Sequence, residues 1–157
     1  MVGVIQTNSR TKERMPGYVG RILRDASTHL FDIGTSEGHA GIERLSFDLD
    51  EVAVALGGGR KIEDILKGGR IGVSADQTEE VLRISRELGE LSSQNGYRSL
   101  PDLSFLLSEL FTCGEGCFRN NRDLYGNLLK KVLGYDDKKI GELDIFENGN
   151  GHHASYS

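Results

Sequence analysis

GTSEGHAGIERLSFDLDEVAV, residues Gly34–Val54, is the stretch on which the predicted fold depends. It opens with a turn of small residues, Gly34-Thr35-Ser36, and ends in an alternating run over residues 45–50. Apolar residues occupy positions 45, 47 and 49, and this period of two predicts a half-buried β-strand. On such a strand Asp48 and Asp50 project from one face, about 6–7 Å apart. They are therefore candidate catalytic carboxylates and candidate ligands for Mg²⁺ or Mn²⁺, which prefer oxygen donors.

The spacing of these residues resembles a known motif. Ile33-Gly34-Thr35, followed after twelve residues by Asp48-Leu49-Asp50, is similar to the motif of the nucleotidyltransferase superfamily of the polymerase-beta type. The resemblance covers the chain up to about residue 76. It implies that Gly34, Thr35 and Ser36 hold nucleotide phosphates, that Asp48 and Asp50 bind metal, and that a third carboxylate lies on a later strand. Two positions depart from the motif, because Thr35 replaces the usual Ser or Gly and Glu51 replaces the usual apolar residue.

Composition and charge limit the class of protein. The chain has 157 residues, of which 37% are hydrophobic and 7% aromatic, with no tryptophan, so we expect a modest aliphatic core. The 21 glycines and two prolines indicate many turns rather than a disordered linker. A net charge of −5 argues against a protein that coats nucleic acid non-specifically. The absence of a secretory h-region and of a membrane-length apolar run predicts a cytoplasmic, intracellular protein without a membrane partner.

The rest of the chain alternates between strand and helix signals in its first half and is helical in its second. We expect a helix after Pro16, strands over residues 28–33, 45–50 and 70–75, and a short helix over 61–67. Longer helices are expected from Thr78 to about residue 95, from Ser99 through residue 111, and from about Asn121 to Gly134. A short strand over residues 143–146 and a mobile tail over 148–157 complete the prediction.

Several residues have two interpretations at this level. Asp76 is a candidate third metal ligand, or else the N-cap of the helix that follows, with Glu79 as the capping-box acid. Cys113 and Cys117 flank a Gly-Glu-Gly loop and are either free thiols or a small chelating or disulfide-bonded pair. His39 lies in the glycine-rich connection, where it either contacts a phosphate or is simply solvated.

A non-enzymatic interpretation competes with the catalytic one. Residues 1–24 contain five basic residues and one acidic residue, so the N-terminal arm is either solvated or able to contact phosphates. The segment from Arg70 to Phe111 predicts strand, helix, turn and helix, an order that resembles the ribbon-helix-helix DNA-binding proteins. Its first helix is longer than in that family and its strand is barely basic, so a plain helical hairpin packed on the sheet is the simpler interpretation.

Together these patterns predict an α+β domain over residues 1–147, with a small mixed sheet over 1–76 and a helical part over 77–134. The predicted function is metal-dependent phosphoryl or nucleotidyl chemistry on a nucleotide or nucleic acid, as a nucleotidyltransferase-like enzyme or a nuclease. Its metal ligands would be Asp48, Asp50 and Asp76. The alternatives are a non-enzymatic DNA-binding or assembly protein that uses the basic N-terminal arm and the helical half, and an inactive relative of the enzyme family.

Overall fold

The computed structural model describes residues 12–59, 70–95, 99–113 and 122–141. In chain order the elements are β1 (Lys12–Pro16), α2 (Tyr18–Glu37), α3 (Ala40–Ala55), β2 (Arg70–Ser74), α5 (Ala75–Asn95), α6 (Ser99–Cys113) and α8 (Arg122–Leu133). Residues 137–141 form a further helical turn. The predictions for residues 61–67, 143–146 and 148–157, and for Cys117, lie outside the described residues.

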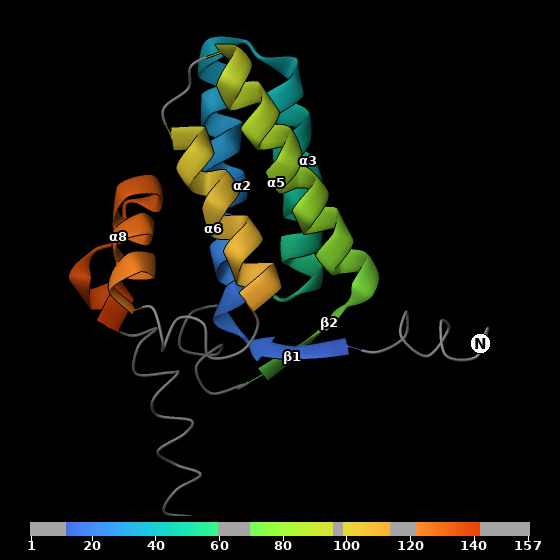
Figure 1. Cartoon of the computed structure of the whole chain (residues 1–157), viewed down its shortest axis with the longest axis vertical. Coiled ribbons are helices and arrows are strands. Elements are labelled where there is room, and N and C mark those ends of the chain that lie inside the picture. Colours follow the sequence, from blue (N-terminus) through green and yellow to red (C-terminus); the bar gives the residue numbers. More distant parts are fainter. Residues whose placement is uncertain (1–11, 60–69, 96–98, 114–121, 142–157) are drawn as a thin grey trace, which may run out of the picture.

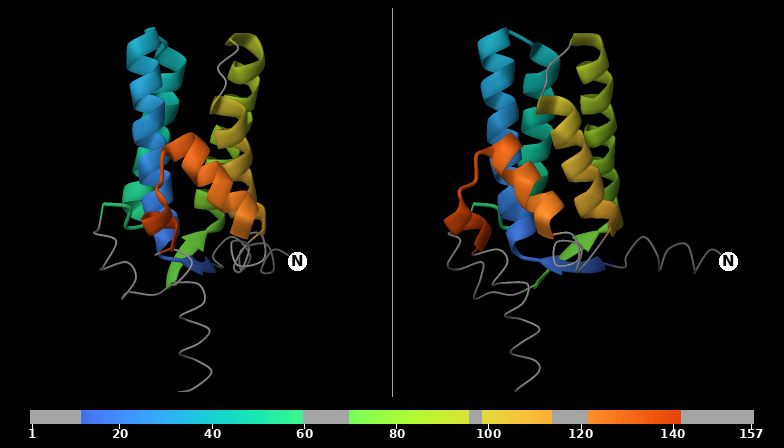
Figure 2. Two further views of the ribbon diagram at one scale, coloured as in Figure 1. Left: turned by 90° about the vertical axis from the view of Figure 1, so that its left-hand side faces the viewer. Right: turned by 60° about the vertical axis from the view of Figure 1, so that its left-hand side comes forward.

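Two helical hairpins, α2–α3 and α5–α6, lie side by side and form the body of the molecule. Figure 1 shows their four helices running along the long axis, with the two strands crossing one end of the bundle. Figure 2 shows the α2–α3 pair on one side and the α5–α6 pair on the other, with α8 packed across the edge between them. Each hairpin follows directly on a strand, so the chain contains two successive strand–helix–helix units.

The two strands form an antiparallel ribbon that ties the hairpins together at their base. Met15 is paired with Ile71, and Glu13 with Val73. Met15 and Val73 are buried, and Ile71 packs against the same core. Because successive residues of a strand point to opposite faces, one face of the ribbon covers the end of the bundle and the other faces away from it. Residues 12, 14, 16, 70, 72 and 74 occupy the register positions of this outer face.

The α2–α3 hairpin stands where strands were predicted over residues 28–33 and 45–50, and both predictions are wrong. In α3 the buried residues follow the helical spacing 42, 45, 49 and 52, whereas Phe47 has 61% of its surface exposed. The period-two pattern is a coincidence of the short window, because Leu45 and Leu49 also lie four residues apart. Gly38, at φ 64°, ends α2 in the left-handed conformation that favours glycine.

The predicted α+β fold with a mixed sheet is therefore wrong, and the described chain is mostly helical. Three predicted helices are confirmed, since α5, α6 and α8 lie within a few residues of the expected bounds. Strand β2 also lies where it was expected, but it pairs with β1 in a two-stranded ribbon rather than joining a sheet. No described helix combines the length and the apolar character that crossing a membrane requires.

A single apolar core joins the two hairpins and α8. It contains aliphatic side chains from every labelled helix, together with the buried Tyr18 and Tyr125. Helix α8 is further attached to α6 by polar contacts at its surface. Tyr125 donates a hydrogen bond to Glu109 (3.3 Å), and Lys131 forms an ion pair with Asp102 (2.9 Å). Burial and the nearby Glu109 carboxylate raise the pKa of Tyr125 to about 12.

Candidate functional site

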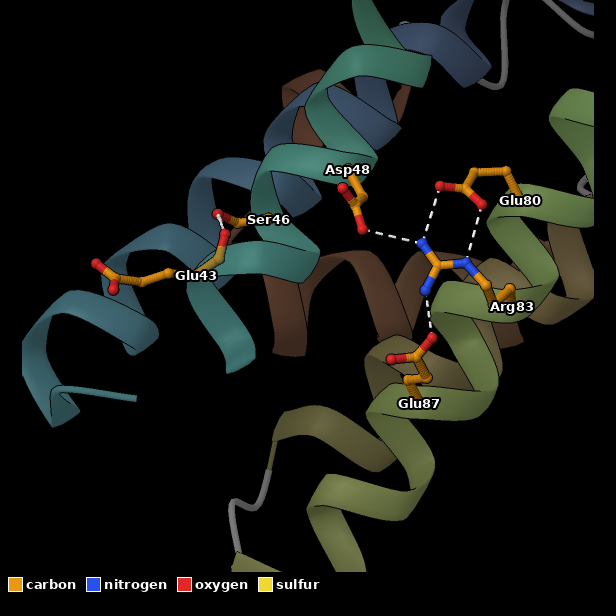
Figure 3. A network of polar contacts seen from close by, with 6 residues as sticks. All are labelled: Glu43, Ser46, Asp48, Glu80, Arg83 and Glu87. Atoms are coloured by element: carbon orange, nitrogen blue, oxygen red, sulfur yellow. Dashed lines mark hydrogen bonds and ion pairs between the residues drawn. The ribbon is translucent and has the colours of Figure 1, made fainter. Parts of the chain in front are cut away.

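Arg83 of α5 connects the two hairpins through one cluster of carboxylates. Its Nη2 atom lies 2.9 Å from Asp48 Oδ2 on α3 and 2.9 Å from Glu80 Oε2 on its own helix, and its Nη1 donates to Glu87. Figure 3 shows the guanidinium surrounded by these three carboxylates. The hydrogen bonds from Arg83 lower the pKa of Glu80, and those to its carboxylate neighbours raise the pKa of Arg83. Asp48 is thus held in an ion pair between α3 and α5.

Asp50 lies on the other flank of α3. Its Oδ1 atom is 3.3 Å from Arg24 Nε and accepts a hydrogen bond from Ser27 (3.2 Å), both on α2. Successive residues of an α-helix are rotated by about 100° about the helix axis, so the side chains of residues two apart point in directions that differ by about 200°. Asp48 and Asp50 therefore diverge, whereas on the predicted strand they would have shared one face.

Asp76 lies exposed in the first turn of α5. The predicted capping role is taken by other residues, because Ser74 Oγ accepts from the Gln77 amide (3.1 Å) and Gln77 Oε1 accepts from the Ser74 amide (2.9 Å). This reciprocal pair is a capping box. Asp76 instead lines an open pocket of about 460 Å³ with Glu79, Glu80, Leu82, Arg83 and Arg86.

These carboxylates do not fit the predicted magnesium or manganese site. A divalent ion needs several oxygen donors converging within about 2.0–2.6 Å. Asp48 and Asp50 instead face arginines on opposite sides of α3. Among the described residues no group of three or more His, Cys, Asp or Glu side chains is placed to hold a metal ion. The metal-dependent function remains a prediction from sequence, and we derive no catalytic step from it.

Gly34, Thr35 and Ser36 form the last turn of α2 rather than a glycine loop. The hydroxyl of Thr35 donates to the Phe31 carbonyl (2.9 Å), and that of Ser36 donates to the Ile33 carbonyl (3.2 Å). This end of a helix carries the negative end of the macrodipole and exposes carbonyl oxygens. An anionic phosphate is favoured at the opposite end, at a helix N-terminus, so the geometry offers no phosphate cradle here.

His39 and the basic residues near the N-terminus have structural contacts. His39 is the N-cap of α3, and its Nδ1 accepts a hydrogen bond from the Ile42 amide (3.2 Å). Arg21 pairs with Asp25 (3.5 Å) within α2, and Arg24 pairs with Asp50. Two of the five basic residues among the first 24 therefore form ion pairs within the α2–α3 hairpin. Cys113 ends α6.

A polar joint lies between α2 and the segment after α8. It surrounds a pocket of about 370 Å³ lined by Asp25, Thr28, His29, Asp32, Leu133, Gly134, Tyr135, Asp136 and Lys139. Tyr135 donates to Asp25 (2.5 Å), and Lys139 lies 4.4 Å above the Tyr135 ring. His29 Nε2 forms a hydrogen bond with Ser99 Oγ (3.3 Å) at the start of α6. Burial lowers the pKa of His29, and the nearby Asp32 opposes that shift.

The ribbon is the feature that sequence analysis missed. Its outer register positions include Lys12, Arg14 and Arg70, with Gly72 opposite Arg14 and Ser74 opposite Lys12. Three basic residues thus occupy register positions of the outer face, on two strands that are 54 residues or more apart in sequence. In β1 the basic residues Lys12 and Arg14 occupy alternate positions, whereas β2 has one basic residue, Arg70. The pairing that joins the two strands depends on the tertiary structure.

Comparison with protein-family models, with curated proteins and with solved structures finds no match for this chain.

Proposed function

We propose that the protein binds duplex DNA through the outer face of the β1–β2 ribbon. The observation that carries this proposal is the register, which assigns Lys12, Arg14 and Arg70 to the face that turns away from the core. Met15 and Val73 occupy the opposite face and are buried. The ribbon therefore has one face with the buried Met15 and Val73, and its three basic residues occupy register positions of the other face.

The dimensions of the ribbon suit a DNA groove. Two antiparallel strands lie about 4.8 Å apart, and the major groove, about 12 Å wide, admits a two-stranded ribbon. Residues two apart on one strand, such as Lys12 and Arg14, are spaced about 6–7 Å along it. The positions that face Lys12 and Arg14 in the register are the small residues Ser74 and Gly72.

The helices also support this orientation. α5 begins at the residue after β2, and α2 begins two residues after β1. The positive ends of both helix dipoles therefore lie at the ribbon, where they favour nearby phosphates. The net charge of −5 keeps the rest of the surface repulsive toward DNA, so binding is confined to this end of the molecule.

The experiment is fluorescence anisotropy with labelled duplex DNA and the full chain over a salt series. We expect log Kd to rise with log salt concentration, and the variants Arg14→Ala and Arg70→Ala each to reduce the slope by up to about 0.9, the value for one lost phosphate contact. Arg86→Ala, on the exposed surface of α5, is the matched control and should leave both affinity and slope unchanged. Arg10→Ala separates a contribution of the N-terminal arm from that of the ribbon.

Salt-independent or undetectable binding of the wild-type chain would refute the proposal. So would equal losses for Arg14→Ala, Arg70→Ala and the Arg86→Ala control, because a diffuse charge effect requires no ribbon.

A further inference from the structure

The outer surface of the α2–α3 hairpin carries large apolar side chains that no described element covers. We call it the α2–α3 outer surface and define it by Phe31, Phe47 and Val54. Their exposed fractions are 40%, 61% and 53%. The two rings lie in contact, with centroids 5.7 Å apart and planes inclined by 52°. They border a shallow pocket of about 250 Å³ between the two helices.

The apolar residues of this surface follow a heptad along α3. Ala40, Phe47 and Val54 are spaced seven residues apart and all three are exposed. The core-facing residues of the same helix, at 42, 45, 49 and 52, are buried. Helix α3 is thus apolar along two stripes, and only the inner one is covered by the rest of the described chain. A seven-residue spacing is the pattern by which one helix packs along another.

Charges of opposite sign flank Phe47 on this stripe. Arg44 lies three residues before it and Glu51 four residues after it, and both are exposed. Neither forms an ion pair with another described residue. The surface is therefore self-complementary. A two-fold rotation about an axis perpendicular to α3 beside Phe47 brings Arg44 of one copy opposite Glu51 of the other.

We propose that this surface is the contact of a homodimer in which two copies of α3 pack antiparallel about a two-fold axis beside Phe47. In that arrangement Arg44 of each copy lies opposite Glu51 of the other. The small Ala40 faces the end of α3 that carries Val54, and the Phe47 rings meet at the axis. A two-fold contact uses one patch on both subunits, with each contact made twice. The contact is formed by α2 and α3 and is independent of the proposed DNA binding.

The size of the surface sets the expected affinity. Sixteen residues of helix extend about 24 Å, and two neighbouring helices span about 20 Å. The contact thus buries on the order of 1,000 Å² in total, at the lower limit for a specific interface. We expect a dimer with a dissociation constant of about micromolar order, which forms and dissociates within an accessible concentration range.

The test is sedimentation equilibrium of the full chain from low micromolar to submillimolar concentration. We expect the wild type to pass from monomer to dimer and Phe47→Glu to remain monomeric. Arg44→Glu and Glu51→Arg, each measured alone, bring like charges together and should weaken the dimer about tenfold or more. An equimolar mixture of these two variants should dimerise again. In the mixed dimer the two substituted side chains face each other with opposite charges, and the unchanged Arg44 of one chain faces the unchanged Glu51 of the other.

The matched controls are Arg86→Glu and Glu79→Arg, which make the same charge changes at exposed positions of α5. Both should dimerise as the wild type does, and circular dichroism should show native helicity for every variant. A wild type that stays monomeric over the whole range overturns the proposal. A dimer that survives Phe47→Glu, or single-charge variants whose mixture fails to recover, places the contact elsewhere and overturns it as well.

Discussion

Replacing Gly20 with alanine tests the closest approach between α2 and α3. A Cβ added at Gly20 would lie 2.5 Å from the Leu56 carbonyl oxygen and 3.1 Å from the Gly58 amide nitrogen. These neighbours are backbone atoms just beyond the end of α3, and Gly58 in turn would place a Cβ 2.3 Å from the Gly20 carbonyl oxygen. The two backbones therefore touch where neither residue has a side chain.

Two opposing effects decide the sign of the change. Alanine in a helix is normally favoured over glycine by about 0.5–1 kcal/mol. At Gly20 the new methyl group must push backbone away by about 1 Å, and overpacking of this kind costs about 1–3 kcal/mol. Because the atoms in the way are backbone, no rotamer change can relieve the contact. We expect Gly20→Ala to lower the free energy of unfolding by about 1–2 kcal/mol, equivalent to a fall in Tm of about 2–8 °C for a chain of this size.

The measurement is urea denaturation of the full chain, with Gly89→Ala as the matched control. Among the described residues, a Cβ at Gly89, inside α5, would meet only the Ser104 hydroxyl at 3.6 Å, an ordinary contact. That variant should gain up to about 1 kcal/mol from helix propensity. The two substitutions are chemically identical and should have opposite signs. A Gly20→Ala variant as stable as Gly89→Ala would refute the close packing of α2 on the segment after α3.

Three further predictions concern the polar contacts. Arg83→Met leaves the carboxylates of Asp48 and its neighbours without their counter-ion, so we expect a loss of about 1–2 kcal/mol in low salt that shrinks in high salt, measured by urea denaturation at both ionic strengths. Adding Mg²⁺ and a nucleotide should shift the Tm of the wild type and of the Asp48→Ala/Asp50→Ala variant equally, because both carboxylates face arginines; a shift confined to the wild type would restore the metal-dependent function. Since burial lowers the pKa of His29, the unfolded chain binds its proton first, and stability should fall as pH drops from about 7 through the unfolded value near 6.5. His29→Gln should flatten that part of the stability profile, and an unchanged profile would contradict the burial of the imidazole.

The sequence by itself determined the helices whose apolar spacing extends over several turns. Val81, Ile84 and Leu88 in α5 repeat at intervals that only a helix brings onto one face. The leucines of α6 do the same from Leu100 to Leu110. In α3 the decisive window was six residues long, and Leu45 and Leu49 satisfy both a two-residue and a four-residue spacing. Only packing against α2 and α5 selects the helix, because it buries residues 42 and 52 together with them.

The choice between strand and helix over residues 45–50 also decided how Asp48 and Asp50 are interpreted. A strand would have brought Asp48 and Asp50 together, whereas a helix turns one toward Arg83 and the other toward Arg24. The direction of a side chain follows from the backbone geometry. The sequence shows that the two carboxylates are present, but not where each of them points. The tertiary structure alone also pairs β1 with β2, and so assigns Arg14 and Arg70 to register positions of one face. Local spacing specifies an element, but long-range contacts decide which elements meet, and the candidate sites of this protein are formed where they meet.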